Sequence, residues 1–380
     1  MVEQIPRCVV KVLHVAQPVD GGVAAVVLAL TADQVARGWT VTVAGPSAGT
    51  LPQAVRRSGG QHRAWSASRG AGLKLPAQCA RLARLIRQEN PDVLHLHSST
   101  AGLVGRLVTR GRVPTLFQPH AWSWWAASGV MLSATVAWER AAAGWTDCVI
   151  AVSEAERENG VARGVQARFE VIPNGVEISP TVPAQWSARQ DLGLQERPTA
   201  VCVGRLALQK DPEMAVRAWP LVLRRVENAC LVLVGTGPLE AHLREIAARL
   251  DLTRAVIFAG PQEHGARWFA AGDVAVLTSR WEGMALTVLE AQAAGRPVVA
   301  TDVGGVRESL APGVGAVVPI GDHEAFAHAV SLLLADPGRA RAEGLRARAY
   351  AVRHFDVRRA VDATASISAR VLRESTITGT

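Results

Sequence analysis

Residues 273–302 read DVAVLTSRWEGMALTVLEAQAAGRPVVATD, and this stretch decides the fold. The apolar run from Asp273 to Thr278 predicts a buried parallel strand, because a strand covered on both faces is apolar along its length. A polar turn follows, and apolar residues at helical spacing then predict a helix that Gly295 closes. Pro297 opens the next strand. Strand, helix and strand in this order form a βαβ unit with a parallel sheet.

Strand-like runs alternate with amphipathic helical stretches in both halves of the chain. The expected strands of the first half are Val9–Ala16, Thr40–Ala44, Val93–His97, Thr115–Gln118 and Cys148–Val152; those of the second half are Thr199–Val203, Cys230–Val234, Ala255–Ala259, Val274–Leu277 and Val298–Thr301. This alternation predicts an α/β protein with two doubly wound, Rossmann-like domains. Ligands of such domains bind beyond the carboxyl ends of the strands.

Prolines at positions 180, 183 and 198 interrupt any regular element between the two halves, so we place the domain boundary there. Residues 1–185 are the expected first domain and residues 186–357 the second. A last helical stretch is expected in residues 358–380.

The composition is that of a soluble globular chain, with 49% hydrophobic and 19% charged residues in a total of 380. The net charge of +8 suits nucleic acid, an anionic membrane surface or an anionic substrate. No run of basic residues interleaved with aromatic ones occurs, which disfavours a nucleic-acid partner.

The five cysteines include no Cys-x-x-Cys pair, and most lie in apolar runs, so we expect reduced, buried thiols of a cytoplasmic protein. Glu3, Arg7 and Lys11 interrupt the N-terminal stretch, and no signal peptide is expected. No run of about 18 apolar residues predicts a membrane span.

Two carboxylates flank the start of the helix in the opening stretch. Glu282 precedes it, and Glu290 follows eight residues later, roughly 12 Å along a helical axis. The backbone N–H groups of Gly283, Met284, Ala285 and Leu286 are expected to be first-turn donors at the positive end of the helix dipole, where a phosphate binds well. The two acids can therefore bracket a nucleotide-sugar.

Two glutamates with seven residues between them resemble the donor-site signature of the retaining glycosyltransferases of family 4, whose fold is called GT-B. The resemblance covers nearly the whole chain. It implies two domains that face each other across a cleft, a final helix that returns to the first domain, and donor-sugar and ribose hydroxyls bound by Glu282 and Glu290, respectively.

The loop from Val203 to Lys210 follows an expected strand and carries two cations, Arg205 and Lys210. Only three of the 41 basic residues are lysine, so a lysine in this loop is unusual for this chain. The resemblance implies that both cations bind the donor diphosphate, for which a guanidinium fork and a compact ammonium are suited. A solvated basic loop is the alternative.

Several glycine-rich turns match further family segments. Gly21 and Gly22 follow the first strand and allow close approach of a ligand, or else only tight packing of the helix. The resemblance adds Gly235 near the base and ribose, and Gly260 with Pro261 at the base. It does not specify which base is bound. Asn174 lies in a Pro-Asn-Gly turn, for which we expect a positional role.

Histidines end one expected strand and follow the next strand in the sequence. The family places a histidine that touches the donor sugar at the position of His120, where a neutral imidazole can bind a hydroxyl; a capping role is the alternative. His95 and His97 share one face of a strand, and a hydrogen-bonded structural role is favoured over metal binding, because no cysteine or carboxylate of suitable spacing completes a site.

The acceptor site is the least defined. The segment that includes Ser98 and Ser99 resembles members that build cell-surface polysaccharides on lipid-linked sugars, although Thr100 stands where those members have lysine. Trp122, Trp124 and Trp125 are candidates for stacking on an acceptor sugar or for contact with a membrane interface. Trp138 and Trp145 lie in the same region, and core packing is the alternative use for at least these two.

The resemblance and these features together imply transfer of a hexose, with retention, from a nucleotide-diphosphate sugar to a hydroxyl acceptor, for which a lipid-linked sugar and a secondary metabolite are both left open. His120, Glu282, Arg205 and Lys210 are the candidate catalytic residues. No Asp-x-Asp occurs, so no metal or other cofactor is expected. The expected location is cytoplasmic, with peripheral contact at the inner membrane face left open. A nucleotide-sugar epimerase or hydrolase, or a non-catalytic nucleotide-sugar-binding protein, are the alternatives.

Overall fold

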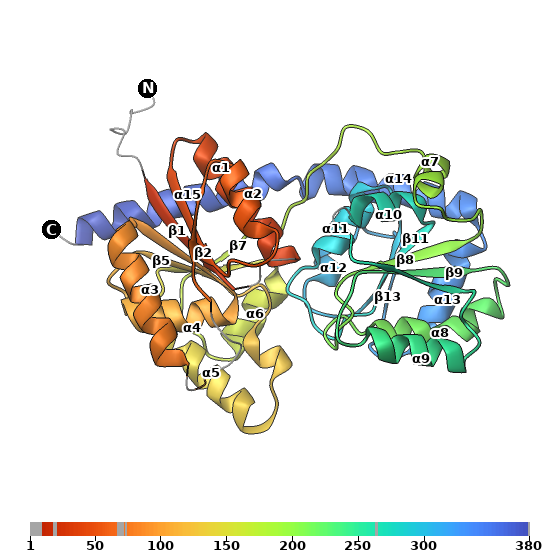
Figure 1. Cartoon of the computed structure of the whole chain (residues 1–380), viewed down its shortest axis with the longest axis horizontal. Helices are drawn as coiled ribbons and strands as arrows, with labels where there is room; N and C mark the ends of the chain where they lie inside the picture. The colour runs from red at the N-terminus through yellow and green to blue at the C-terminus, as the bar shows by residue number, and fades with distance from the viewer. Residues whose placement is uncertain (1–9, 18–20, 67–71, 73, 263–264, 379–380) are drawn as a thin grey trace. The chain divides into compact units, whose positions relative to one another are not determined.

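The computed structural model describes residues 10–17, 21–66, 72, 74–262 and 265–378 (Figure 1). The chain divides into two compact units. Residues 1–173 and 358–380 form unit 1, and residues 174–357 form unit 2.

Unit 1 is built on one sheet of seven parallel strands in the order β3-β2-β1-β4-β5-β6-β7. The strands are β1 (Lys11–Ala16), β2 (Thr40–Gly45), β3 (Gln61–Ala64), β4 (Val93–His97), β5 (Thr115–Gln118), β6 (Cys148–Ala151) and β7 (Phe169–Val171). The helices are α1 (Gly22–Ala36), α2 (Leu51–Arg57), α3 (Leu75–Glu89), α4 (Ser98–Thr109), η1 (Ser123–Ala126), α5 (Gly129–Ala143), α6 (Glu154–Ala162) and α15 (Val357–Thr378). The strand order reverses between β1 and β4, which is where doubly wound sheets bind their ligands.

Helices cover both faces of this sheet. On one face, Leu13 and Val15 of β1 lie in a core with residues of α3 and α4. On the other face, Val12 packs with Ile367 and Val371 of α15. Charged side chains also join α15 to unit 1, including Arg168, whose Nη1 lies 2.9 Å from Glu374 Oε2. The final helix is therefore an integral part of unit 1.

Unit 2 repeats the plan with six parallel strands in the order β10-β9-β8-β11-β12-β13. They are β8 (Thr199–Val203), β9 (Cys230–Val234), β10 (Val256–Gly260), β11 (Val274–Leu277), β12 (Val298–Thr301) and β13 (Ala316–Val318). The helices are α7 (Gln185–Asp191), α8 (Pro212–Leu223), α9 (Glu240–Arg249), α10 (Gly265–Ala271), α11 (Leu286–Ala293), α12 (Val306–Ser309), α13 (His323–Leu334) and α14 (Pro337–His354). Alternate strand residues face α8, α9 and α13 on one side and α10, α11 and α12 on the other.

The predicted α/β class and the ten predicted strands are confirmed, to within about two residues at each end. The start of the first one, at Val9, lies outside the described residues. Three strands, β3, β7 and β13, were not predicted, and each lies at the edge of its sheet.

The described cysteines Cys79, Cys148, Cys202 and Cys230 are free thiols, and all but Cys79 are buried; Cys8 lies outside the described residues. Among the described helices, none combines the length and the apolar character that crossing a membrane requires.

Candidate functional site

Loops at the carboxyl edge of the sheet in unit 2 are joined by backbone hydrogen bonds. The Gly204 N–H after β8 donates to Val234 O at 2.9 Å, and the Gly235 N–H after β9 donates to Gly260 O at 2.8 Å. Gly235 has φ 136°, and a Cβ added there would lie 2.1 Å from Gly204 O. Only glycine allows the loops after β8 and β9 to approach this closely.

The loop after β8 is also fixed to the loop after β11. The Arg280 N–H donates to Gln209 O at 2.8 Å, and the Thr278 hydroxyl donates to Lys210 O at 3.1 Å. The Arg280 guanidinium lies 2.8 Å from the Asp211 carboxylate. Sequence reasoning did not identify this pair. In the structure, Asp211 has φ 42°, a value that is uncommon for residues other than glycine.

Lys210 and Glu282 form an ion pair at the centre of these loops. Lys210 Nζ lies 2.5 Å from Glu282 Oε1, and the Ser279 hydroxyl donates to the same oxygen at 2.7 Å. The Glu282 side chain is only 8% exposed, against 23% for Lys210. A carboxylate this buried needs such partners, because removing its water is costly. The structure thus brings together two residues that the sequence placed in one site from positions 72 residues apart.

Glu290 lies on α11 and is in electrostatic contact with Lys210. Burial raises the pKa of the Glu290 carboxyl, and the Lys210 ammonium opposes part of that rise. No described residue donates a hydrogen bond to this carboxylate, and a Cβ added at Gly265 would lie 3.7 Å from its Oε2. Glu290 therefore keeps its acceptor capacity for a ligand.

Helix α11 begins at Leu286, so the first-turn N–H groups are those of Leu286 and Thr287 rather than of Gly283. No described residue accepts a hydrogen bond from these two N–H groups, and the buried Thr287 hydroxyl also has no partner among the described residues. The preceding loop is held in place, because the Asn174 amide donates to Met284 O at 2.9 Å. Asn174 therefore has the positional role that its turn predicted.

The remaining donor candidates are placed as follows. Arg205 is exposed in the loop that carries Lys210, and Ala285 is buried immediately before α11. Gly260 adopts φ 71° with Pro261 exposed beside it. In unit 1, Gly21 adopts φ 77° and precedes α1, whose first residue is Gly22; residues 18–20 of that loop lie outside the described residues.

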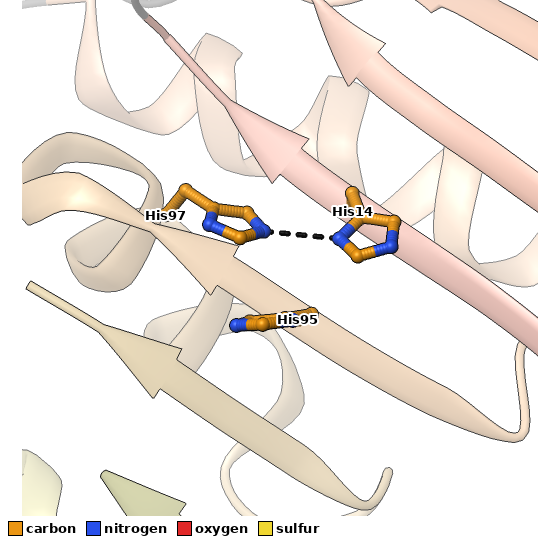
Figure 2. A group of neighbouring side chains, drawn as sticks. All are labelled: His14, His95 and His97. Carbon is orange, nitrogen blue, oxygen red and sulfur yellow. Dashed lines mark hydrogen bonds between the residues drawn. The ribbon is translucent and has the colours of Figure 1, made fainter. Parts of the chain in front are cut away.

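Unit 1 contains a group of histidines at the carboxyl ends of its central strands. Figure 2 shows His14 of β1 beside His95 and His97 of β4, with a hydrogen bond between His14 Nδ1 and His97 Nε2 of 3.0 Å. His14 Nε2 lies 2.8 Å from the Gln34 amide oxygen, and His97 Nδ1 lies 3.1 Å from Nε2 of His120. Four residues that are distant in sequence thus form one hydrogen-bonded chain.

Burial keeps these imidazoles neutral. It lowers the pKa of His14 to about 4 and that of His120 to about 3. Burial and the neighbouring imidazoles also hold the pKa values of His95 and His97 well below the usual range. No described residue makes a well-formed hydrogen bond to His95, whose pKa the nearby Gln118 side chain raises only in part.

The backbone at His120 is unusual and is fixed by a buried carboxylate. His120 has φ 57° and Ala121 has φ 114°, both of which are uncommon for residues other than glycine. The Ala121 N–H donates to Glu156 Oε1 at 2.7 Å, and the Val152 N–H donates to Glu156 Oε2 at 2.8 Å. Glu156 therefore holds the His120 loop against the end of β6.

The ring nitrogens of His14, His95 and His97 lie within 4.8 Å of one another, a spacing that can suit a metal ion. His14 Nδ1 and His97 Nε2 already share a hydrogen bond, and the group of three histidines includes no carboxylate to balance a buried cation. The hydrogen bonds of His97 to His14 and His120 agree with the hydrogen-bonded role that we expected for His97, whereas His95 has no such bond among the described residues. Sequence reasoning missed His14; the available signal was a polar residue within an apolar strand.

The acceptor candidates differ in exposure. Ser98 and Ser99 are partly exposed at the start of α4, where Ser98 has φ 68°. Trp122 and Trp124 are 1% and 2% exposed and stack on each other with their ring centroids 4.3 Å apart. This burial corrects their expected use, since neither ring is open to an acceptor. Trp125 is partly exposed, and its indole N–H donates to the Asn159 amide oxygen at 3.1 Å.

Comparison with known sequences identifies two families. The model described as Glycosyltransferase Family 4 matches residues 20–179, and the model described as Glycosyl transferases group 1 matches residues 197–336. A GDP-mannose-dependent alpha-(1-6)-phosphatidylinositol monomannoside mannosyltransferase of Mycolicibacterium smegmatis is 32% identical over 75% of this chain and 78% of its own length. A D-inositol 3-phosphate glycosyltransferase of Nocardia farcinica is 32% identical over 73% of this chain and 68% of its own length.

Solved structures share the fold. The crystal structure of Anabaena HepE in complex with UDP and glucose has a TM-score of 0.81 and 22% identity, over 94% of this chain and 99% of that chain. Sucrose-phosphate synthase from Thermosynechococcus elongatus has a TM-score of 0.82 and 22% identity, over 96% of this chain and 100% of that chain. Both likenesses support the predicted GT-B architecture of two Rossmann-like domains.

Proposed function

Because this chain belongs to glycosyltransferase family 4, we propose that it transfers a hexose from a nucleotide-diphosphate sugar to a hydroxyl of a lipid-linked acceptor, with retention and without a metal ion. The observation that carries this proposal is the Lys210–Glu282 ion pair, with Glu290 in electrostatic contact with the same lysine. One ammonium between two carboxylates is suited to a ligand that carries both anionic phosphates and neutral hydroxyls.

Each candidate donor residue is assigned to one part of the nucleotide-sugar. Lys210 and Arg205 bind the diphosphate, assisted by the free N–H groups at the start of α11. When Lys210 turns to a phosphate oxygen, the Glu282 carboxylate becomes available to accept hydrogen bonds from the sugar hydroxyls. Glu290 accepts from the ribose hydroxyls, because a carboxylate can accept two hydrogen bonds at once.

The reaction breaks the bond between the anomeric carbon and the diphosphate oxygen. The acceptor oxygen bonds to that carbon on the same face, and its proton passes to the departing phosphate oxygen. Negative charge grows on the diphosphate in the transition state, where Lys210, Arg205 and the α11 terminus stabilise it. His120, whose burial keeps it neutral, is proposed to accept a hydrogen bond from a sugar hydroxyl.

The names of the relatives support the proposed classes of donor and acceptor. The mycobacterial relative is named for GDP-mannose and a phosphatidylinositol mannoside, and a relative from Escherichia coli, 28% identical, is named for UDP-galactose and a sugar on diphosphoundecaprenol. Acceptors of this kind reside at a membrane surface, so we place the enzyme at the cytoplasmic face of a membrane, where its net charge of +8 favours anionic lipid.

The test is mass spectrometry of products formed from GDP-mannose and UDP-hexoses, with phosphatidylinositol mannosides and polyprenyl diphosphate sugars as acceptors, in excess EDTA. We expect one donor to yield a glycosylated acceptor, and Lys210→Ala to lower its turnover at least about a hundredfold. Lys74→Ala, an exposed lysine of unit 1, is the control. Donor that isomerises or hydrolyses equally well without any acceptor would favour the epimerase or hydrolase, and activity that disappears in EDTA would contradict the metal-free mechanism.

A further inference from the structure

The hydrogen-bonded histidines of unit 1 have a feature that the donor site does not explain. The chain runs from the Gln34 amide through His14 and His97 to His120, with successive atom separations of 2.8, 3.0 and 3.1 Å. His14 and His97 are fully buried, so neither ring can touch a substrate. Two buried imidazoles therefore connect a candidate catalytic ring to a neutral amide on α1.

A neutral imidazole carries one N–H and one lone pair, so every hydrogen bond in such a chain must point the same way. The Gln34 oxygen can only accept, and it fixes the direction. His14 Nε2–H donates to Gln34, His97 Nε2–H donates to His14 Nδ1, and His120 Nε2–H donates to His97 Nδ1. The Nδ1 atom of His120 is then left with its lone pair, and no described residue donates to it.

We propose that His14 and His97 are positioning residues that hold the His120 ring in one orientation and in the Nε2–H tautomer, so that its Nδ1 accepts a hydrogen bond from a sugar hydroxyl. This inference rests on the proposed function for the identity of the ligand. Glu156 completes the arrangement by holding the backbone on the C-terminal side of His120 through the Ala121 N–H.

His95 provides a matched control. It is as buried as His14, lies directly opposite His14 in the register of β1 and β4, and belongs to no part of the hydrogen-bonded chain (Figure 2). His95→Phe and His14→Phe replace a buried imidazole with the same larger ring on adjacent strands. A purely structural role for the group predicts similar effects from both substitutions.

The first measurement needs no substrate. In protein labelled with ¹⁵N-histidine, the ring nitrogen shifts report tautomer and charge directly, and His120→Asn assigns the His120 signals. We expect His120 to be neutral and Nε2-protonated from pH 5 to 9. His14→Phe should leave His97 without an acceptor, so that the His120 signals show a mixture of tautomers. His95 packs against His97 with ring centroids 4.0 Å apart but is not its hydrogen-bond acceptor, so His95→Phe should shift the signals without changing the tautomer. An Nδ1–H tautomer or a titration near the ordinary value in the unaltered protein would overturn the inference.

The second measurement is kinetic. His14→Phe and the milder Gln34→Leu should lower kcat by about tenfold or more, because misplacing a contact group is costly in the transition state, while changing KM for the nucleotide-sugar less than about twofold. Equal losses in His95→Phe would show a structural effect only. Stoichiometric zinc with shifted histidine signals would also contradict the proposal, because a metal would take the same nitrogens. Absence of any transfer would defeat the proposed function but would leave the tautomer result standing.

Discussion

Glu290 is a partly buried carboxyl group without a hydrogen-bond donor among the described residues, and this burial raises its pKa. The folded protein then holds this proton more tightly than the unfolded chain does. Folding stability is therefore lost as the pH rises from the unfolded pKa through the raised folded pKa, and above that range the loss is complete. The ligand-free enzyme is therefore less stable at neutral pH than at low pH by this contribution, and the ionised Glu290 carboxylate is available to accept hydrogen bonds from a ligand.

Glu290→Gln should therefore raise the thermal unfolding temperature of the ligand-free protein at pH 7, with the gain disappearing below about pH 4. The same change should weaken nucleoside diphosphate binding by about 1–3 kcal/mol in calorimetry, because a charged acceptor of the ribose hydroxyls is lost. Glu245→Gln, on an exposed glutamate of unit 2, should alter neither. Unchanged nucleotide affinity in Glu290→Gln would remove Glu290 from the donor site.

Single functional residues were predictable where a residue type that is rare in this chain occurs in a candidate loop. Lys210 was identified because lysine is rare in this chain, and the structure places it against Glu282. His14 could not be paired with His97 from sequence, because 83 residues separate them and only the β1–β4 pairing brings them together. Trp122 and Trp124 were misjudged because tryptophan suits both a sugar platform and a core.

At the scale of elements, the donor loops depend on backbones that nearly touch. Gly235→Ala would place a Cβ 2.1 Å from Gly204 O, at a backbone φ that is unfavourable for alanine. We therefore expect the free energy of unfolding to fall by about 2–5 kcal/mol and nucleotide binding to weaken. Gly193→Ala isolates the strain alone, because Gly193 has φ 64° and open space around it. Denaturant titration should separate the two variants; equal losses would mean that the loop contact contributes nothing.

Central strands were predictable from the sequence and edge strands were not. A central strand such as β9 is buried along its whole length and is apolar throughout. The edge strand β3 has the sequence Gln-His-Arg-Ala, and none of its residues is buried. It therefore contains no apolar run from which a strand could be predicted. The start of α11 was placed three residues early, because the turn that precedes it is fixed by contacts such as the Asn174–Met284 hydrogen bond, which sequence spacing does not reveal.

At the scale of the whole molecule, unit 1 is made from two separate parts of the chain. Ile367 is 6% exposed in a core shared with β1, β4, β5 and β6, so Ile367→Ala should reduce the free energy of unfolding by about 2–5 kcal/mol. Arg373→Ala, at an exposed position on the same helix, should stay within about 0.5 kcal/mol of the unaltered protein. Equal stability of the two variants would show that α15 is not needed by the sheet.

Because unit 1 contains both ends of the chain, it cannot complete its folding until translation is nearly finished. Residues up to 173 emerge first, but the sheet face around Val12 and Val93 stays uncovered until residues 358–380 have been synthesised. Unit 2 is continuous in sequence and can fold during that interval. The nascent chain therefore exposes an apolar surface throughout most of translation, and this surface is a natural target for chaperones.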